Sequence, residues 1–128
     1  MGAAVYYAAE ADRWAELAAV EISAAAVSEV SAAVHRIFST HNQVSVEVVR
    51  KRGTASELNP AGRGRWLIRL GEGASWLMLI HEVAHLDGVL ARGWAAERHD
   101  ETHAQTVDVW AHWVIRRFGN LLASDLAR

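Results

Sequence analysis

The chain has 128 residues, of which 52% are hydrophobic and 22% charged, and its formal net charge is -2. This balance is typical of a globular protein and excludes disordered, collagenous and rod-like chains; the length suffices for one core, so residues 1–128 are expected to form a single domain. Cysteine is absent, which excludes disulfide scaffolds, thiol nucleophiles and Cys-ligated metal sites, so any metal must be held by His, Asp or Glu.

The chain lacks the apolar segments that a membrane protein needs. No stretch approaches the roughly 18 uncharged apolar residues of a membrane span. Glu10, Asp12 and Glu16 occupy the region where a signal peptide would need an apolar run. We therefore expect a soluble, cytoplasmic protein with no membrane partner.

Residues 3–38 predict a long amphipathic helix, because apolar side chains recur there at helical spacing without Gly or Pro. We expect one break, near Glu21. A helix that packs against a sheet accounts for this apolar stripe, and we assign these residues no catalytic or binding role.

Residues 44–52 and 65–70 are rich in β-branched residues and partly alternate, which predicts two strands. The turn-rich connection from Gly53 to Gly64 is too short for a crossover helix, so an antiparallel hairpin with a long tip, or a small three-stranded sheet, is expected. Against Glu57, this hairpin carries six basic side chains: Arg50, Lys51, Arg52, Arg63, Arg65 and Arg69. They indicate either a solvated flank or a surface for nucleic acid or an acidic partner.

The second half of the chain predicts two more helices. Ser75 is a candidate N-cap for a helix over Trp76–Leu90 that stops near Gly88 or Gly93. The last helix begins near Asp100 and is expected to end before Gly119, after Arg116-Arg117 in its last turn. The predicted fold class is α+β: a long N-terminal helix, a hairpin or small sheet, a central helix and a closing helix.

The chemistry lies in His81-Glu82-Val83-Ala84-His85, an H-E-x-x-H motif in the middle of the predicted central helix. His81 and His85 are one turn apart on one face, so both imidazoles can converge on one tetrahedral zinc ion. Glu82 adjoins the first ligand and can reach a zinc-bound water without displacing it, the position that a general base needs.

A catalytic zinc has three protein ligands and a water, so a third ligand must lie downstream. Ala91 occupies the position of the third His in the H-E-x-x-H-x-x-G-x-x-H metalloproteases, which excludes that class. The remaining candidates lie at or on the last helix: His99, Asp100, Glu101, His103, Asp108 and His112.

The strand over residues 65–70, the motif helix and the segment from Arg98 to Trp110 together resemble the small SprT-like, or minimal zincin, metallopeptidases of bacteria and bacteriophages. The resemblance covers residues 65–118. It implies that His81, His85 and His99 bind zinc, that Glu82 is the catalytic base, and that His103 takes the place of a packing aromatic. Asp100 departs from the family by replacing its usual Gly, and no Cys-rich zinc ribbon follows.

These features predict zinc-dependent hydrolysis of a peptide or protein substrate, in which Glu82 takes the proton of a zinc-activated water. We expect the strand over residues 65–70 to offer an edge for an extended substrate. Tyr6 and Tyr7 are remote from the motif in sequence, so the oxyanion-stabilising group stays unassigned.

Two alternatives stay open. One is a catalytically silent, zincin-shaped binding module whose basic hairpin contacts nucleic acid or an acidic protein. The other is a metallopeptidase whose third ligand is acidic, Glu101 or Asp108. For His103, we expect a core-facing ring that bonds a backbone carbonyl or the second nitrogen of His99.

Overall fold

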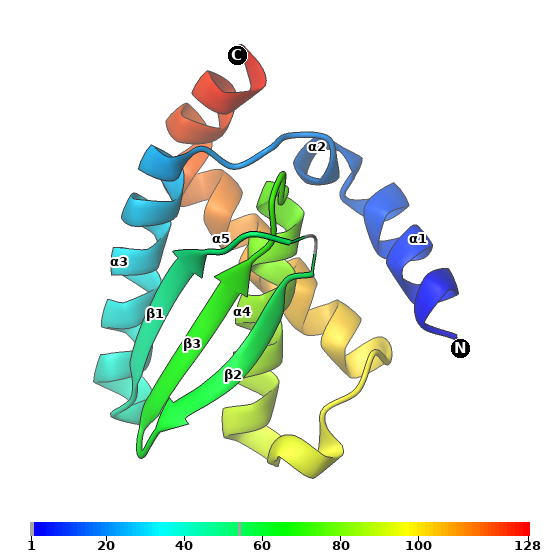
Figure 1. The fold of residues 1–128 in the computed structure, drawn as a ribbon. Helices are drawn as coiled ribbons and strands as arrows, with labels where there is room; N and C mark the ends of the chain where they lie inside the picture. The colour runs from blue at the N-terminus through cyan, green and yellow to red at the C-terminus, as the bar shows by residue number, and fades with distance from the viewer. Residues whose placement is uncertain (1, 54) are drawn as a thin grey trace.

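The sheet and the helices form an α+β arrangement in the computed structural model, which describes residues 2–53 and 55–128 (Figure 1). A three-stranded sheet lies over helix α4, with α3 along one flank and α1 on the opposite side. In chain order the elements are α1 (Ala3–Arg13), α2 (Ala15–Ala18), α3 (Ala24–Asn42), β1 (Ser45–Arg50), β2 (Glu57–Gly62), β3 (Arg65–Leu70), α4 (Trp76–Arg92), the 3-10 helix η1 (Trp94–Ala96) and α5 (Glu101–Leu126). The buried apolar side chains of these layers form one continuous cluster.

The predicted N-terminal helix is broken twice. The expected break near Glu21 is confirmed: Glu21 forms an isolated bridge with Ser75, and α3 starts afresh with Ser23 as its N-cap. A further break was not predicted. The backbone of Trp14 has non-helical dihedral angles (φ -117°, ψ 45°), so α1 ends before it. The indole Nε1 of Trp14 donates a hydrogen bond to Asp108 of α5 at 2.8 Å.

The sheet order is β1-β3-β2. The predicted antiparallel pairing between residues 44–52 and residues 65–70 is wrong. β1 pairs with β3 in parallel, and β2, which lies within the predicted connection, pairs antiparallel with β3. The tight turn around Gly62 (φ 131°) and Gly64 (φ 67°) makes this hairpin possible. β3 is therefore the central strand, not an edge, and β2 is the free edge on the side of the α4–α5 connection. Thr54, in the β1–β2 connection, lies outside the described residues.

Both of the last two helices run past their predicted ends, and the end predicted for the last helix, before Gly119, is wrong. α4 begins after its Ser75 cap and ends at Arg92, with Gly93 (φ 89°), one of the two predicted stops, as its C-cap. α5 continues through Gly119 with a kink at Phe118. Its far end is anchored because Asp125 accepts hydrogen bonds from Ser23 N at 2.9 Å and from Trp76 Nε1 at 2.8 Å.

Of the helices in the described ranges, none combines the length and the apolar character that a bilayer crossing requires.

Candidate metal centre

Helix α4 holds the motif between the sheet and α5, so both His81 and Glu82 are buried, with exposed fractions of 1% and 5%. His85, one turn later, is half-buried. α5 and the segment before it supply the facing groups. Asp100 caps α5 by accepting from His103 N at 3.0 Å, and His99, just before this cap, turns its ring toward α4.

Three imidazole nitrogens converge at this point. His81 Nε2 lies 3.1 Å from both His85 Nε2 and His99 Nε2, and the last two are 2.9 Å apart. Nitrogens bound at about 2.0–2.1 Å to a tetrahedral zinc ion lie about 3.3 Å from one another. The triangle is therefore close to the size that such an ion requires, and these residues could hold a metal ion.

The protonation of the rings suits a metal ligand. Burial lowers the pKa of His85 to about 2, with the neighbouring imidazoles adding to the decrease. Burial also lowers the pKa of His99. Neutral imidazoles keep the lone pair that a metal ion needs.

Glu10 of α1 orients His81. Its Oε1 accepts a hydrogen bond from His81 Nδ1 at 2.8 Å, and both side chains are at least 93% buried. This bond places the proton of His81 on Nδ1 and leaves Nε2 free for a metal, the arrangement found around metal-bound histidines. Sequence reasoning missed Glu10. The available signal was its position, four residues after Tyr6 and four before Trp14, on the buried stripe of α1.

A second carboxylate lies beside His85. Glu97 Oε1 is 3.7 Å from His85 Nδ1, and the Glu97 side chain is only 7% exposed. It can approach because residue 88 is glycine: a Cβ there would lie 1.5 Å from Glu97 Oε2. Arg92 donates to the same carboxylate at 3.1 and 3.2 Å. The absence of a side chain at Gly88 therefore leaves the space that the Glu97 carboxylate occupies.

Glu82 faces a cavity of about 320 Å³ next to the three nitrogens. Its lining includes His85, His99, Leu58 of β2 and the exposed Trp94. Burial raises the pKa of Glu82 to about 7, with smaller increases from neighbouring carboxylates and an opposing effect of His81. A carboxylate with such a pKa can accept and return a proton near neutral pH.

The two tyrosines, remote in sequence, lie at this site. The Tyr7 hydroxyl is 3.4 Å from His99 Nε2, and the Tyr7 ring stacks on His81 at a centroid distance of 5.1 Å. Tyr6 is buried, and its hydroxyl bonds His103 Nδ1. Sequence reasoning missed both positions, because nothing in the local pattern of α1 indicates what it packs against.

His103 bonds a backbone carbonyl, one of the two partners expected for it. Its Nε2 donates to the carbonyl oxygen of His81 at 3.3 Å, and its ring stacks on His85 at 3.9 Å between centroids. It lies outside the triangle of Nε2 atoms, although it forms a second potential ligand group with Glu10 and His81. In that group, Glu10 and His81 Nδ1 are already joined to each other by a hydrogen bond.

The other third-ligand candidates have different surroundings. Asp108 accepts two hydrogen bonds from Arg13, both at 2.7 Å, and one from Trp14. Glu101 is exposed on the first turn of α5. Within the described ranges, neither acid belongs to a potential ligand group.

The chain matches no protein-family model, and neither the curated proteins nor the solved structures contain a significant match. The likeness to SprT-like zincins therefore stays a prediction from the motif and its spacing.

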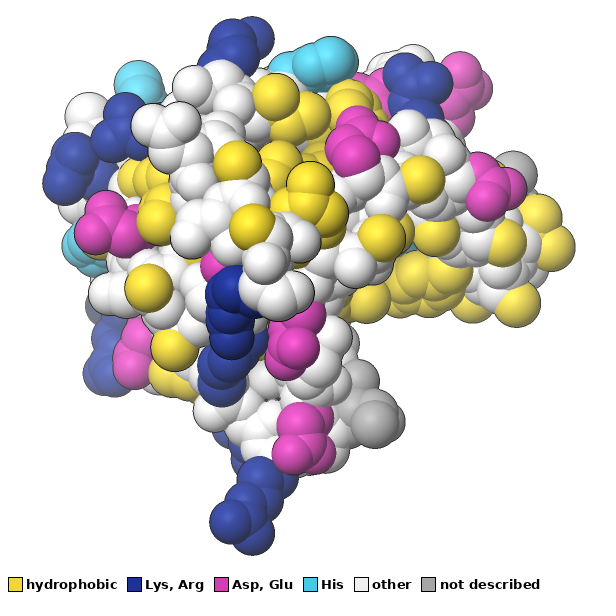
Figure 2. Space-filling view, turned by 90° about the horizontal axis from the view of Figure 1, so that it is seen from above, with side chains coloured by type: hydrophobic (Ala, Val, Ile, Leu, Met, Phe, Trp, Pro, Cys, Tyr) yellow, Lys and Arg dark blue, Asp and Glu magenta, His cyan; other side chains and the backbone are white. Residues whose placement is uncertain are grey.

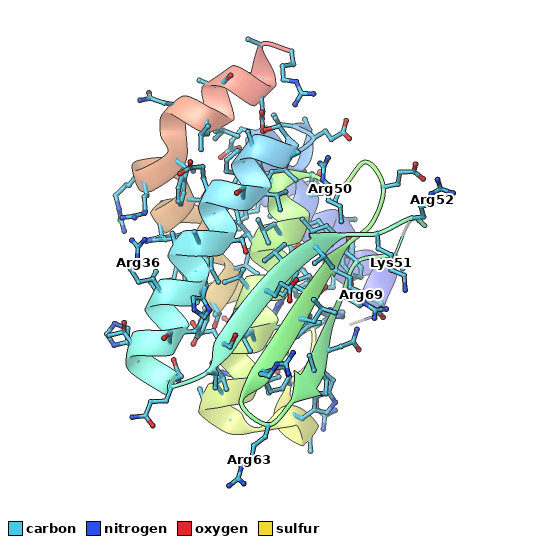
Figure 3. All side chains as sticks on the ribbon, turned by 60° about the vertical axis from the view of Figure 1, so that its left-hand side comes forward. Arg36, Arg50, Lys51, Arg52, Arg63 and Arg69 are labelled. Carbon is cyan, nitrogen blue, oxygen red and sulfur yellow. The ribbon has the colours of Figure 1, made fainter. Side chains whose placement is uncertain are left out.

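Among the labelled basic side chains of the predicted hairpin, Arg50, Lys51, Arg52 and Arg69 lie toward one end of the sheet (Figure 3). Figure 3 shows Arg63 at the end of the sheet opposite to Arg50 and Arg52. Arg50 is engaged with the carbonyl oxygen of Ile22, and Arg69 donates to Glu57 at 3.4 Å. Seen from above, basic and acidic side chains are interspersed (Figure 2).

Proposed function

We propose that this protein is a zinc-dependent metallopeptidase. The observation that carries the proposal is the convergence of three imidazole Nε2 atoms within 3.1 Å of one another, beside a buried carboxylate, Glu82, that faces an open cavity. A structural ion needs no such base, whereas hydrolysis does. The predicted likeness to SprT-like zincins supports the same activity.

In this proposal His81, His85 and His99 would hold the zinc ion, which when bound would supply a Lewis acid and lower the pKa of a water molecule. Glu82 removes the proton of the attacking water, and then delivers it to the nitrogen of the departing amine. Glu10 keeps His81 in the tautomer that binds metal through Nε2.

The free edge of β2 is the best place for the peptide. Ser56, Glu57 and Leu58, at the start of this strand, line the same cavity as Glu82. An extended peptide can pair with an exposed strand and so bring one carbonyl over the site. Pro60 interrupts the edge, because proline has no N–H to donate, and thereby restricts productive pairing to the first half of β2.

The test combines metal analysis with Glu82→Gln, which keeps the size of the side chain and removes the base. Purified wild type should contain one zinc per chain and hydrolyse fluorescein-labelled denatured casein. Glu82→Gln should keep its zinc while hydrolysis falls by about 100-fold or more. The matched control is Glu101→Gln, the same chemical change at an exposed position, which should retain both zinc and activity.

Two results would contradict the proposal. A zinc-free wild type whose melting temperature does not respond to added zinc would exclude the metal, because a ligand of the native state must stabilise it. Equal casein hydrolysis by wild type and Glu82→Gln would exclude Glu82 as the base. Loss of zinc from Glu101→Gln would instead favour an acidic third ligand.

A further inference from the structure

Tyr7 is the one hydroxyl group of α1 that reaches the cavity beside the metal-binding nitrogens. Its oxygen lies 3.4 Å from His99 Nε2, and its ring contacts two ligand rings, stacked on His81 and edge-on to His99, both at 5.1 Å between centroids. Glu82 lines the same cavity. The hydroxyl is therefore positioned next to the reacting centre by rings that the metal would itself immobilise.

A bound ion would change the partner of this hydroxyl. Among the described residues, His99 Nε2 is its hydrogen-bond partner, and that nitrogen gives its lone pair to the metal in the proposed centre. The O–H of Tyr7 is then free to donate to an oxygen atom in the cavity. Tyr7 is 39% exposed, so a substrate can reach it.

We propose that the Tyr7 hydroxyl donates the hydrogen bond that stabilises the oxyanion during peptide hydrolysis, an inference that rests on the proposed function. The water oxygen forms a bond to the carbonyl carbon while Glu82 takes the water proton. The π electron pair moves onto the carbonyl oxygen, and Tyr7 donates to this oxygen without losing its proton. The electron pair then returns, the C–N bond breaks, and the proton held by Glu82 passes to the amine nitrogen.

Tyr6, the neighbouring residue, does not compete for this role. It is only 5% exposed, and its hydroxyl is engaged with His103 Nδ1. The two adjacent tyrosines thus have separate functions: Tyr6 supports His103, and Tyr7 faces the cavity.

The experiment compares wild type with Tyr7→Phe, and uses Val5→Ala as a control substitution at an exposed site of α1. Binding of acetohydroxamate, a small chelator with an anionic oxygen, is followed by the visible absorption of the Co²⁺-substituted proteins. Tyr7→Phe should bind acetohydroxamate about 10-fold more weakly, the effect of one lost bond to a charged oxygen. Its zinc affinity should match that of the wild type. Val5→Ala should resemble the wild type in both measurements.

With labelled casein, Tyr7→Phe should lower kcat by about 100-fold, with KM little changed. Equal acetohydroxamate affinity in wild type and Tyr7→Phe would overturn the inference, and so would a wild type that does not bind the probe. A 10-fold loss of zinc affinity in Tyr7→Phe would show a permanent metal ligand instead. A wild type that hydrolyses no casein would refute the proposed function, and the acetohydroxamate comparison would still decide the position of the hydroxyl.

Discussion

We expect the substitution Gly88→Ala to weaken zinc binding while it leaves the stability of the metal-free protein nearly unchanged. A Cβ at this position would meet Glu97 Oε2 at 1.5 Å, Glu97 Cδ at 2.5 Å and Arg92 Nη2 at 2.7 Å. All three atoms belong to the far ends of flexible side chains, so the Glu97 carboxylate must swing away from α4. His85 then loses the charge that lies 3.7 Å from its Nδ1.

The opposing contributions to stability nearly cancel. Alanine in a helix interior is favoured over glycine by about 0.5–1 kcal/mol. Loss of the Arg92–Glu97 ion pair, which involves a partly exposed Arg92, costs about 0–1 kcal/mol. The free energy of unfolding of the metal-free protein should therefore change by less than about 1 kcal/mol.

Zinc affinity should fall in the same variant. Groups that support a metal-bound histidine contribute about 10- to 100-fold in affinity. The distance from Glu97 to His85 is longer than a hydrogen bond, so we expect the lower end, about 10-fold. Competition with a chromophoric chelator measures the affinity, and urea unfolding of the metal-free protein measures stability. Glu97→Gln, which removes the charge and leaves Gly88 in place, is the matched control and should lose a similar factor.

Zinc affinities of both variants equal to that of the wild type would contradict this prediction, because Glu97 would then have no influence on His85. A decrease of several kcal/mol in the free energy of unfolding of Gly88→Ala would also contradict it, because the Glu97 carboxylate would then be unable to move away from α4.

Two further predictions concern α5. His99→Ala should weaken zinc binding by more than 100-fold, whereas His103→Ala should weaken it by about 10- to 100-fold at most; a chelator titration that reverses this order would remove His99 from the ligand set. Hydrogen bonds from Ser23 N and Trp76 Nε1 outweigh the opposing effect of burial and lower the pKa of Asp125. This stabilisation is present above the unfolded pKa of about 3.9 and is lost as the pH falls through the lower folded pKa. Urea unfolding between about pH 2 and pH 6 should therefore show a smaller acid-dependent loss of stability in Asp125→Asn than in wild type, and equal pH profiles would contradict this account.

The elements that sequence reasoning predicted well are those whose signals are local. The apolar periodicity of α4, its Ser75 cap and the stop at Gly93 all lie within the element itself. The same locality explains why His81 and His85 could be paired from their spacing alone. The N-cap at Asp100 likewise indicated that the chain before α5 turns there, which places His99 near the motif.

The features that were missed depend on long-range packing. Only Leu58 is a buried apolar residue in β2, which also contains Pro60 and ends at Gly62, so the strand has no alternating pattern to reveal it. Its pairing with β3 displaces β1 to the far side of the sheet and makes that contact parallel. Glu10 and Tyr7 could not be assigned to the site, since their partners lie more than 70 residues away along the chain.

The separation between α1 and its partners also determines when the metal centre can be completed during synthesis. Glu10 is 71 residues from His81, and Arg13 is 95 residues from Asp108. At a translation rate of about 5–20 residues per second, the second interval lasts roughly 5–20 s. α1 buries only Tyr6 and Glu10, both against residues made later. Among the described helices, the one synthesised first is therefore among the last to dock. Newly made α4 must keep His81 without its carboxylate partner until α1 docks.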